Sequence, residues 1–300
     1  MPLSAAFRLD LPASYRAGDA LAYHGRDPLS LTERVEGTTL YKAMVVAGTG
    51  VVLEMAFEPG AVRCRVAWPE APDPALAAPV RARVLRMLGL GAEPEAFEAF
   101  VGQGDPAFTA LIAPRLGLRI PLTADVWESL VWAILGQQVN LAFAYTMRRR
   151  LTERCGGELH LGLRAHPTPE AVAALDPAEL APLQFSRNKA DYVVGVARLV
   201  ASGALPLEAF PAGAAEDAAA QLSAVRGIGP WTTHYVLMRG CGFPDCVPIG
   251  DAGLTLALQR HYGLDHRPGP KETAQLMAPF APHRSLATFH LWASLKGVPA

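Results

Sequence analysis

The residue types in the segment 226–232, which reads Arg-Gly-Ile-Gly-Pro-Trp-Thr, suit the binding of an anion. Glycine adopts positive φ without steric cost, so Gly227 and Gly229 predict a tight reversal and a close approach of the backbone to a ligand. Pro230 suits the first position of a following helix, where its missing N–H would be unpaired anyway. Backbone N–H groups at a helix N-terminus bind anions. A phosphate of the DNA backbone is such an anion, and it can be bound whatever the base sequence is. We therefore predict a phosphate-binding hairpin with Ile228 pointing inward, the alternative being an ordinary corner between two helices.

A second feature is Asp251, which ends a loop rich in Gly and Pro over residues 240–250 and precedes an apolar, helix-forming segment. Taken alone, Asp251 is an N-cap. A helix N-terminus also favours the charged form of a carboxylate, and a charged carboxylate can stabilise a sugar oxocarbenium ion or act as the base for an attacking water. The two roles are compatible, and the sequence leaves open whether Asp251 activates water or only stabilises the cation.

These features occur in a recognisable order: a helix, a Gly-hydrophobic-Gly hairpin, a second helix, a loop rich in Gly and Pro, and an aspartate. In this order the sequence resembles the helix-hairpin-helix DNA glycosylase superfamily, and looks most like its bacterial 3-methyladenine DNA glycosylase II (AlkA-type) branch. Two further segments agree, residues 132–139 (Trp-Ala-Ile-Leu-Gly-Gln-Gln-Val) and residues 284–292. The resemblance is specific over about residues 120–296 and only architectural over residues 1–118.

The resemblance implies an enzyme that flips alkylated purines, such as 3-methyladenine and 7-methylguanine, out of damaged double-stranded DNA and excises them in base excision repair. Asp251 would be its catalytic residue. Aromatic faces suit cationic bases, and the base pocket implied comprises Trp231, Tyr235, Trp292 and Gln137. The DNA-binding residues implied are Arg226, Gly227, Ile228, Gly229, Thr232 and Gln138. Core packing is the alternative for Tyr235 and Trp292, and which of Gln137 and Gln138 enters the base stack is left open.

Two absences refine this expectation. Bifunctional members of the superfamily have a lysine nucleophile where this chain has Trp231, so the resemblance implies a monofunctional enzyme without lyase activity that leaves an abasic site. No four closely spaced cysteines occur near the C-terminus, so we expect no iron–sulfur cluster and no metal in catalysis, while a monovalent cation at the hairpin is left open. The alternatives are a non-catalytic helix-hairpin-helix DNA-binding protein, which would need neither Asp251 nor the aromatic residues, and a glycosylase for hypoxanthine or an oxidised purine.

The overall charge limits how DNA could be bound. Lys and Arg number 27 and Asp and Glu 28, a net charge of −1, which argues against a broad basic surface and favours a local contact. The densest basic cluster, Arg148–Arg150 with Arg154, predicts a solvated helix face, with a DNA border as the alternative. The N-terminus does not resemble a secretory signal, and no uncharged stretch approaches the roughly 18 apolar residues of a membrane span. We expect a cytoplasmic monomer that has no membrane contact and keeps its four cysteines reduced.

Hydrophobic patterning predicts an α+β N-terminal domain over residues 1–118, with a small antiparallel sheet and helices, followed by an all-α helix-hairpin-helix domain over residues 119–300. The hairpin lies at residues 222–240, and residues 203–215 are expected to form a loop. The predicted strands are 40–46, 51–57 and 61–68, followed by a turn at 70–74 and a helix at 75–88. The later predicted helices are 123–137, 138–155, 168–175, 188–202, 215–225, 231–240, 251–262, 270–278 and 284–296.

Overall fold

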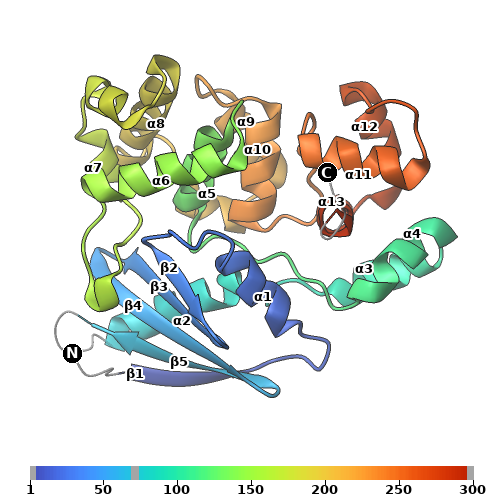
Figure 1. Ribbon diagram of the computed structural model, residues 1–300, viewed down its shortest axis with the longest axis horizontal. Helices are drawn as coiled ribbons and strands as arrows, with labels where there is room; N and C mark the ends of the chain where they lie inside the picture. Colours follow the sequence, from blue (N-terminus) through green and yellow to red (C-terminus); the bar gives the residue numbers. More distant parts are fainter. Residues whose placement is uncertain (1–4, 69–73, 296–300) are drawn as a thin grey trace. The chain divides into compact units, whose positions relative to one another are not determined.

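The computed structural model describes residues 5–68 and 74–295 (Figure 1). The chain forms two compact units, each built from two separate stretches. The first unit contains residues 1–85 and 131–207, and the second contains residues 86–130 and 208–300. The predicted boundary at residues 118/119 falls inside the second unit, and as a division into domains it stays a prediction.

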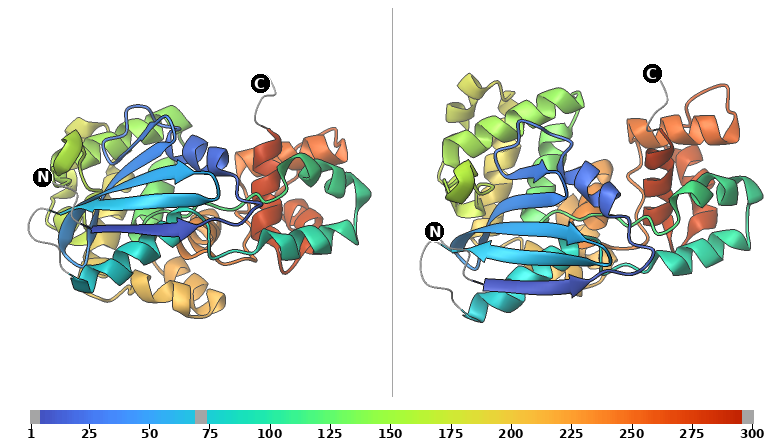
Figure 2. Two further views of the ribbon diagram at one scale, coloured as in Figure 1. Left: turned by 90° about the horizontal axis from the view of Figure 1, so that it is seen from below. Right: turned by 60° about the horizontal axis from the view of Figure 1, so that its bottom comes forward.

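The first unit contains a five-stranded antiparallel sheet with the strand order β1-β5-β4-β3-β2, so that β1 and β2 form its edges (Figure 2). The strands are β1 (Ala5–Asp10), β2 (Glu33–Glu36), β3 (Thr39–Val46), β4 (Thr49–Glu58) and β5 (Ala61–Ala67). The three predicted strands are confirmed, whereas the two edge strands were not expected. Val46 pairs with Thr49, which leaves Ala47 and Gly48 at φ 47° and 80° as a two-residue turn whose twist suits a hairpin.

Helices make up most of the remaining chain, as the periodicity predicts. Those that begin before residue 130 are α1 (Ala17–His24), α2 (Ala77–Met87), α3 (Pro94–Gly102), α4 (Pro106–Ile112) and α5 (Val126–Gly136). Those that follow are α6 (Leu141–Cys155), α7 (Pro169–Ala173), α8 (Arg187–Ala201), α9 (Ala215–Ser223), α10 (Pro230–Val236), α11 (Ala252–Tyr262), α12 (Pro270–Met277) and α13 (Arg284–Ser294). Shorter 3-10 helices lie at Pro74–Leu76, Ala113–Arg115, His160–Gly162, Pro177–Leu183, Leu207–Ala212 and Ala278–Phe280, and a π-helical turn lies at Leu237–Cys241.

Some sequence expectations differ from the structure. The expected loop at 203–215 is wrong in part, because Leu207–Ala212 forms a 3-10 helix with buried Leu207 and Phe210. Helices α1, α3 and α4 were not expected. The predicted turn at 70–74 lies almost entirely outside the described residues. The predicted fold class, an antiparallel sheet followed by helices that contain the hairpin, is confirmed.

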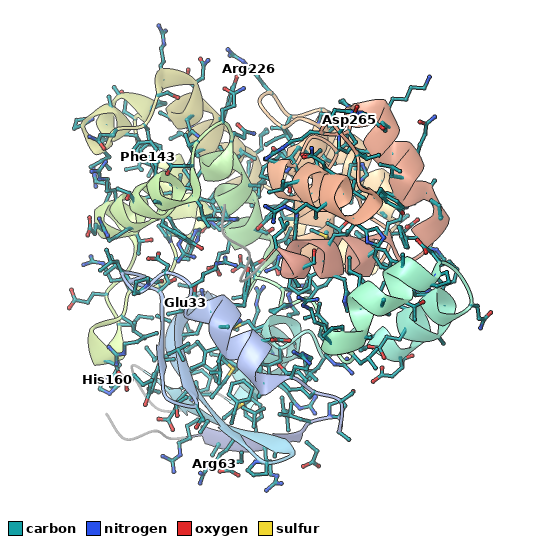
Figure 3. All side chains as sticks on the ribbon, turned by 45° about the vertical axis from the view of Figure 1, so that its right-hand side comes forward. Glu33, Arg63, Phe143, His160, Arg226 and Asp265 are labelled. Atoms are coloured by element: carbon teal, nitrogen blue, oxygen red, sulfur yellow. The ribbon has the colours of Figure 1, made fainter. Side chains whose placement is uncertain are left out.

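A buried ion network lies in the first unit around Glu33, which Figure 3 labels. Glu33 Oε1 lies 3.4 Å from Arg148 Nη1, and its Oε2 lies 3.0 Å from His24 Nδ1 and 3.5 Å from Lys42 Nζ. Arg148 Nη2 also lies 3.2 Å from Asp27 Oδ2. Burial by itself would raise the pKa of Glu33, but the charges of Lys42, His24 and Arg148, together with the His24 hydrogen bond, lower this pKa well below its usual value.

This network corrects the expectation for the basic cluster on α6. Arg148 is only 6% exposed, so the predicted solvated face is wrong for this residue. Arg150 donates to the Leu183 carbonyl at 3.1 Å, and Arg154 pairs with Glu179. These arginines therefore bind groups of their own unit.

Candidate active site

The hairpin joins α9 to α10 in the second unit. Gly227 has φ 89°, in the left-handed region that favours glycine, whereas Gly229 has an ordinary φ of −91° and is the N-cap of α10. The predicted need for positive φ therefore holds at Gly227 alone. A Cβ atom at Gly229 would meet no protein atom within 4 Å, so the backbone there is open to an approaching ligand. Ile228 is 6% exposed, which confirms that it points inward.

The other hairpin residues differ in their exposure. Arg226 is exposed (Figure 3), so its guanidinium is accessible to a ligand. Thr232, by contrast, is only 2% exposed, and its side chain is unavailable for a direct contact at the surface. Any contact of Thr232 with DNA would therefore use its backbone in the first turn of α10. Ser223 Oγ lies 3.3 Å from Thr233 Oγ1 and ties the end of α9 to α10.

Asp251 is the N-cap of α11, and its carboxylate accepts three hydrogen bonds. Oδ1 accepts from the backbone N–H of Leu254 at 2.7 Å and from Trp292 Nε1 at 2.9 Å, while Oδ2 accepts from Trp231 Nε1 at 3.0 Å. The cap predicted from the sequence is confirmed, and the two indole contacts add to it. Since Trp231 lies in the first turn of α10 and Trp292 in the last turn of α13, three helices meet at this carboxylate.

The loop before Asp251 is held by the first turn of α13. Arg284 forms a bidentate pair with Asp245, both N···O distances being 2.6 Å, and its hydrogen bonds hold the pKa of Asp245 below its usual value. Ser285 Oγ donates to the Phe243 carbonyl at 2.7 Å and accepts from Cys246 N at 2.9 Å. This clamp was not predicted, because its partners lie 39 or more residues apart and have no local signature.

The three predicted pocket aromatics lie together beside Asp251. Trp231 and Tyr235, one helical turn apart on α10, stack with ring centroids 5.2 Å apart and planes 27° apart. Tyr235 and Trp292 follow at 6.5 Å and 43°. All three side chains are only partly buried, so the core-packing alternative accounts for only part of their surfaces.

The carboxylate of Asp251 has no ion-pair partner among the described residues: across residues 5–68 and 74–295, no Lys, Arg or His lies within ion-pair distance of it. Its three donors are neutral N–H groups, and two of them are the N–H edges of Trp231 and Trp292. A carboxylate held only by neutral donors can attract a cation from outside, and the nearby stacked rings of Trp231 and Tyr235 favour a cation too.

The predicted residues Gln137 and Gln138 belong to the first unit, in the turn between α5 and α6. Gln138 is exposed and has φ 56°, a left-handed conformation that costs a residue other than glycine about 1–2 kcal/mol. The structure thus brings Asp251, Trp231, Tyr235 and Trp292 together with the hairpin in one unit. Gln137 and Gln138 are described with the other unit, and the roles assigned to all of these residues stay predictions.

Among the described residues, no group of three or more His, Cys, Asp and Glu side chains could hold a metal ion. No helix in the described part of the chain is both long enough and apolar enough to cross a membrane. The expected absence of an iron–sulfur cluster and the cation left open at the hairpin stay predictions.

Residues 131–282 match the family model described as HhH-GPD superfamily base excision DNA repair protein. The chain belongs to this superfamily. It is 36% identical over 195 residues to a DNA-3-methyladenine glycosylase of Bacillus subtilis, a match that covers 64% of each chain and thus just under two thirds of the relative. It is 31% identical over 219 residues, 72% of each chain, to DNA-3-methyladenine glycosylase 2 of Escherichia coli.

Among solved structures, a 3-methyladenine DNA-glycosylase from Archaeoglobus fulgidus has the same fold. The TM-score is 0.84 at 23% identity, and the match covers 97% of this chain and 98% of that one. The family model and the Escherichia coli relative confirm the resemblance to the superfamily that the sequence indicated. The fold shared with the Archaeoglobus fulgidus protein includes the N-terminal sheet as well as the helices.

Proposed function

We propose that this HhH-GPD protein is a monofunctional DNA glycosylase that flips alkylated purines out of damaged duplex DNA and cleaves their N-glycosidic bonds. The observation that carries this proposal is the carboxylate of Asp251, held by three neutral donors beside the stacked rings of Trp231 and Tyr235. The names of the Bacillus subtilis and Escherichia coli relatives support 3-methyladenine as a substrate. A pure DNA-binding protein would need Asp251 only as the cap of α11 and would not need the aromatic residues beside it.

The chemistry follows from where positive charge lies during the reaction. A purine alkylated at N3 or N7 is cationic, and the aromatic faces bind it as a cation. When the glycosidic bond breaks, the base leaves with the bonding electron pair as a neutral purine, and the positive charge passes to the sugar as an oxocarbenium ion. Asp251 then stabilises a charge that is absent from the sugar in the ground state, which is the interaction that accelerates a reaction. Water adds to C1′ and loses a proton, which leaves an abasic site.

The absence of lyase chemistry follows from the residue at position 231. An indole nitrogen has no available lone pair for attack on a sugar, and that of Trp231 donates its N–H to Asp251. The residue that stands in place of a nucleophilic lysine thus orients the carboxylate. We expect water to be the only nucleophile.

DNA binding is assigned to the hairpin. The backbone of residues 227–232 at the start of α10 would hold a phosphate and exposed Arg226 would add a positive charge, while Gln137 and Gln138 would contact the damaged duplex. A local contact of this kind agrees with the net charge of −1. The monomeric state and the cytoplasmic location stay predictions from the sequence.

The proposal is tested by incubating the protein with duplex DNA that carries 3-methyladenine or 7-methylguanine and measuring the released base. We expect release by the wild type and a loss on the order of 100-fold or more in Asp251→Asn, a typical effect of removing a stabilising electrostatic group. Asp265→Asn is the matched control, since Asp265 is an exposed carboxylate of the same unit (Figure 3). Borohydride should trap no covalent complex.

Each alternative has its own outcome. Equal release by wild type and Asp251→Asn would remove Asp251 from the mechanism. Tight binding of DNA with no release of any base would instead indicate the non-catalytic binding protein. Hypoxanthine and 8-oxoguanine duplexes test the remaining alternative; we expect slower release of both, because a neutral base gains less from aromatic faces and is a poorer leaving group.

A further inference from the structure

Lys189 is a buried cation of the first unit that the proposed reaction does not use directly. It lies in the first turn of α8 and is 8% exposed. Its Nζ donates to three backbone carbonyl oxygens, those of Leu135 at 2.7 Å, Gln137 at 2.9 Å and Ile134 at 3.0 Å. An ammonium has three protons, so these three contacts use its full donor capacity.

The position of Lys189 conflicts with its own helix and suits a neighbouring one. A cation in the first turn of α8 faces the positive end of that helix, where a carboxylate would be favoured. The same cation lies at the C-terminal end of α5, where carbonyl groups lack partners within the helix and a positive charge is favoured. Burial lowers the pKa of Lys189 to about 8, which still leaves the side chain mostly protonated at pH 7. The tertiary contact with α5 therefore accounts for a residue that local preference disfavours.

One of the three bonds extends beyond the helix. Ile134 and Leu135 belong to the last turn of α5, but Gln137 belongs to the turn that leads into α6. Because the peptide group is planar, holding the Gln137 carbonyl also sets the direction of the Gln138 N–H. The N–H of Gln138 belongs to that peptide group, and Gln138 has φ 56°, which is unfavourable for glutamine. Lys189 thus binds the peptide group that precedes Gln138, the residue with the unfavourable φ.

We propose that Lys189 is a positioning residue that holds the Gln137–Gln138 turn in the conformation that contacts DNA. This role rests on the proposed function, in which Gln137 and Gln138 touch the damaged duplex. The carbonyl of Gln137, the residue after α5, belongs both to the helix end and to the peptide that enters the turn, so the bond from Lys189 caps the helix and fixes this peptide at once. Without the ammonium, three carbonyl groups lose a charged donor, and the exposed turn can relax to ordinary φ values.

The variant that removes the donors is Lys189→Met, which keeps most of the side-chain length and apolar stem. Its matched control is Arg198→Met on the same helix, because Arg198 also donates to two carbonyls, those of Ala173 and Leu175, in a different segment. Lys189→Arg is the second variant; it keeps the charge, but its planar fork cannot direct three protons as a tripod. All assays are run where urea unfolding shows each variant to be fully folded.

The first readout is base release under single-turnover conditions at saturating protein. We expect Lys189→Met to be about 10-fold slower or more and Lys189→Arg to be intermediate, while Arg198→Met matches the wild type. The second readout is the fluorescence of 2-aminopurine placed beside an abasic-site analogue, which rises when neighbouring bases unstack. We expect the rise seen with the wild type to be lost in Lys189→Met, although binding to undamaged duplex changes by less than about 3-fold.

The decisive test combines Lys189→Met with Gln138→Ala. If Lys189 acts through the turn, the two substitutions remove the same effect. The double variant should then release base at a rate within about 3-fold of the slower single variant. The positioning role would be overturned if the losses of base release in the two single variants multiplied in the double variant. Equal release by Lys189→Met and Arg198→Met would also overturn it. If Lys189→Met does not fold, Lys189→Arg takes its place in the same cycle. A wild type that releases no base would instead overturn the proposed function, so the two failures are distinguishable.

Discussion

Glu33 in the first unit and Asp251 in the second are two carboxylates held by contrasting sets of donors. Glu33 lies between Arg148, Lys42 and His24, which carry or can carry positive charge. Asp251 is held by two indoles and one backbone N–H, all neutral. In the first case protein cations neutralise the charge, which serves the fold. In the second the charge remains available to a cation that comes from outside, which is what a reaction through an oxocarbenium ion requires.

The largest expected effects come from neutralising the two carboxylates, which should affect stability at Glu33 and base release at Asp251. Glu33→Gln should lower the free energy of unfolding by about 3–5 kcal/mol, because it removes the negative charge that faces the buried side chains of Arg148, Lys42 and His24. Asp251→Asn should cost much less stability but at least about 100-fold in base release. Urea unfolding and single-turnover release measured on both variants check this. Equal losses of stability would mean that the contrast between the two sites is wrong.

Acid pH should affect the two units in different ranges. The pKa of Glu33 is lowered in the folded state, so its contribution to stability is complete above about pH 4.5 and is lost as the pH falls toward the folded-state value. In the second unit, burial lowers the pKa of His261, and burial together with the charge of Arg284 lowers that of His234. These histidines bind protons more readily when unfolded, so the second unit should lose stability as the pH falls below about 6.5.

Exposed His266 acts in the opposite sense, because hydrogen bonds to Asp265 and Glu272 raise its pKa. The measurement is urea unfolding at several pH values, followed by a hydrogen-exchange pulse at one fixed pH and mass spectrometry of peptides from each unit. Simultaneous loss of both units on acidification, starting near pH 4.5, would contradict the prediction.

A smaller effect should follow from removing single indole donors. Trp231→Phe or Trp292→Phe keeps an aromatic face but deletes one hydrogen bond to the carboxylate, and we expect about a 10-fold loss of base release, as for other hydrogen bonds to charged groups. Trp68→Phe is the control, since Trp68 is buried in the first unit and its Nε1 has no hydrogen-bond partner among the described residues. If the control loses as much activity as Trp231→Phe, the indole bonds are not what matters.

The smallest predicted effect concerns two glycines at the same helical position. A Cβ atom at Gly253 in α11 would lie 3.2 Å from Asp251 Oδ1 and 3.3 Å from Trp292 Cδ1, whereas at Gly18 in α1 it would meet nothing within 4 Å. Gly253→Ala should slow base release by roughly 2- to 5-fold, because small overpacking shifts side chains. Gly18→Ala should leave release unchanged and raise stability by less than about 1 kcal/mol. Release rates and unfolding midpoints of the two variants test this pairing.

The part of the site that sequence could predict is local. The reversal at Gly227, the inward Ile228 and the cap at Asp251 each follow from residues within a few positions of one another. The indole bonds to Asp251 span 20 and 41 residues, so geometry alone revealed them. From the sequence, only the residue types of Trp231 and Trp292 were known, and the family resemblance assigned them to a base pocket.

Elements whose stability comes from distant partners were missed for the same reason. Strand β2 reads Glu-Arg-Val-Glu, a poor strand by composition, and forms by pairing with β3 at the sheet edge. Arg148 was expected on a solvated face because its partners Asp27 and Glu33 lie 121 and 115 residues away. Lys189 did offer a local signal, a cation in the first turn of a helix, which only its neighbour explains.

The interleaving of the two units has a consequence for synthesis on the ribosome. The first unit has all of its residues once residue 207 has been made, whereas the second needs the chain to its last stretch. At ordinary translation speeds residues 208–300 take roughly 5 to 20 s to synthesise, longer than many domains need to fold. The Gln138 turn and its lysine tether are thus free to form before Asp251 has been synthesised. During that interval residues 86–130, already made, await the second half of their own unit.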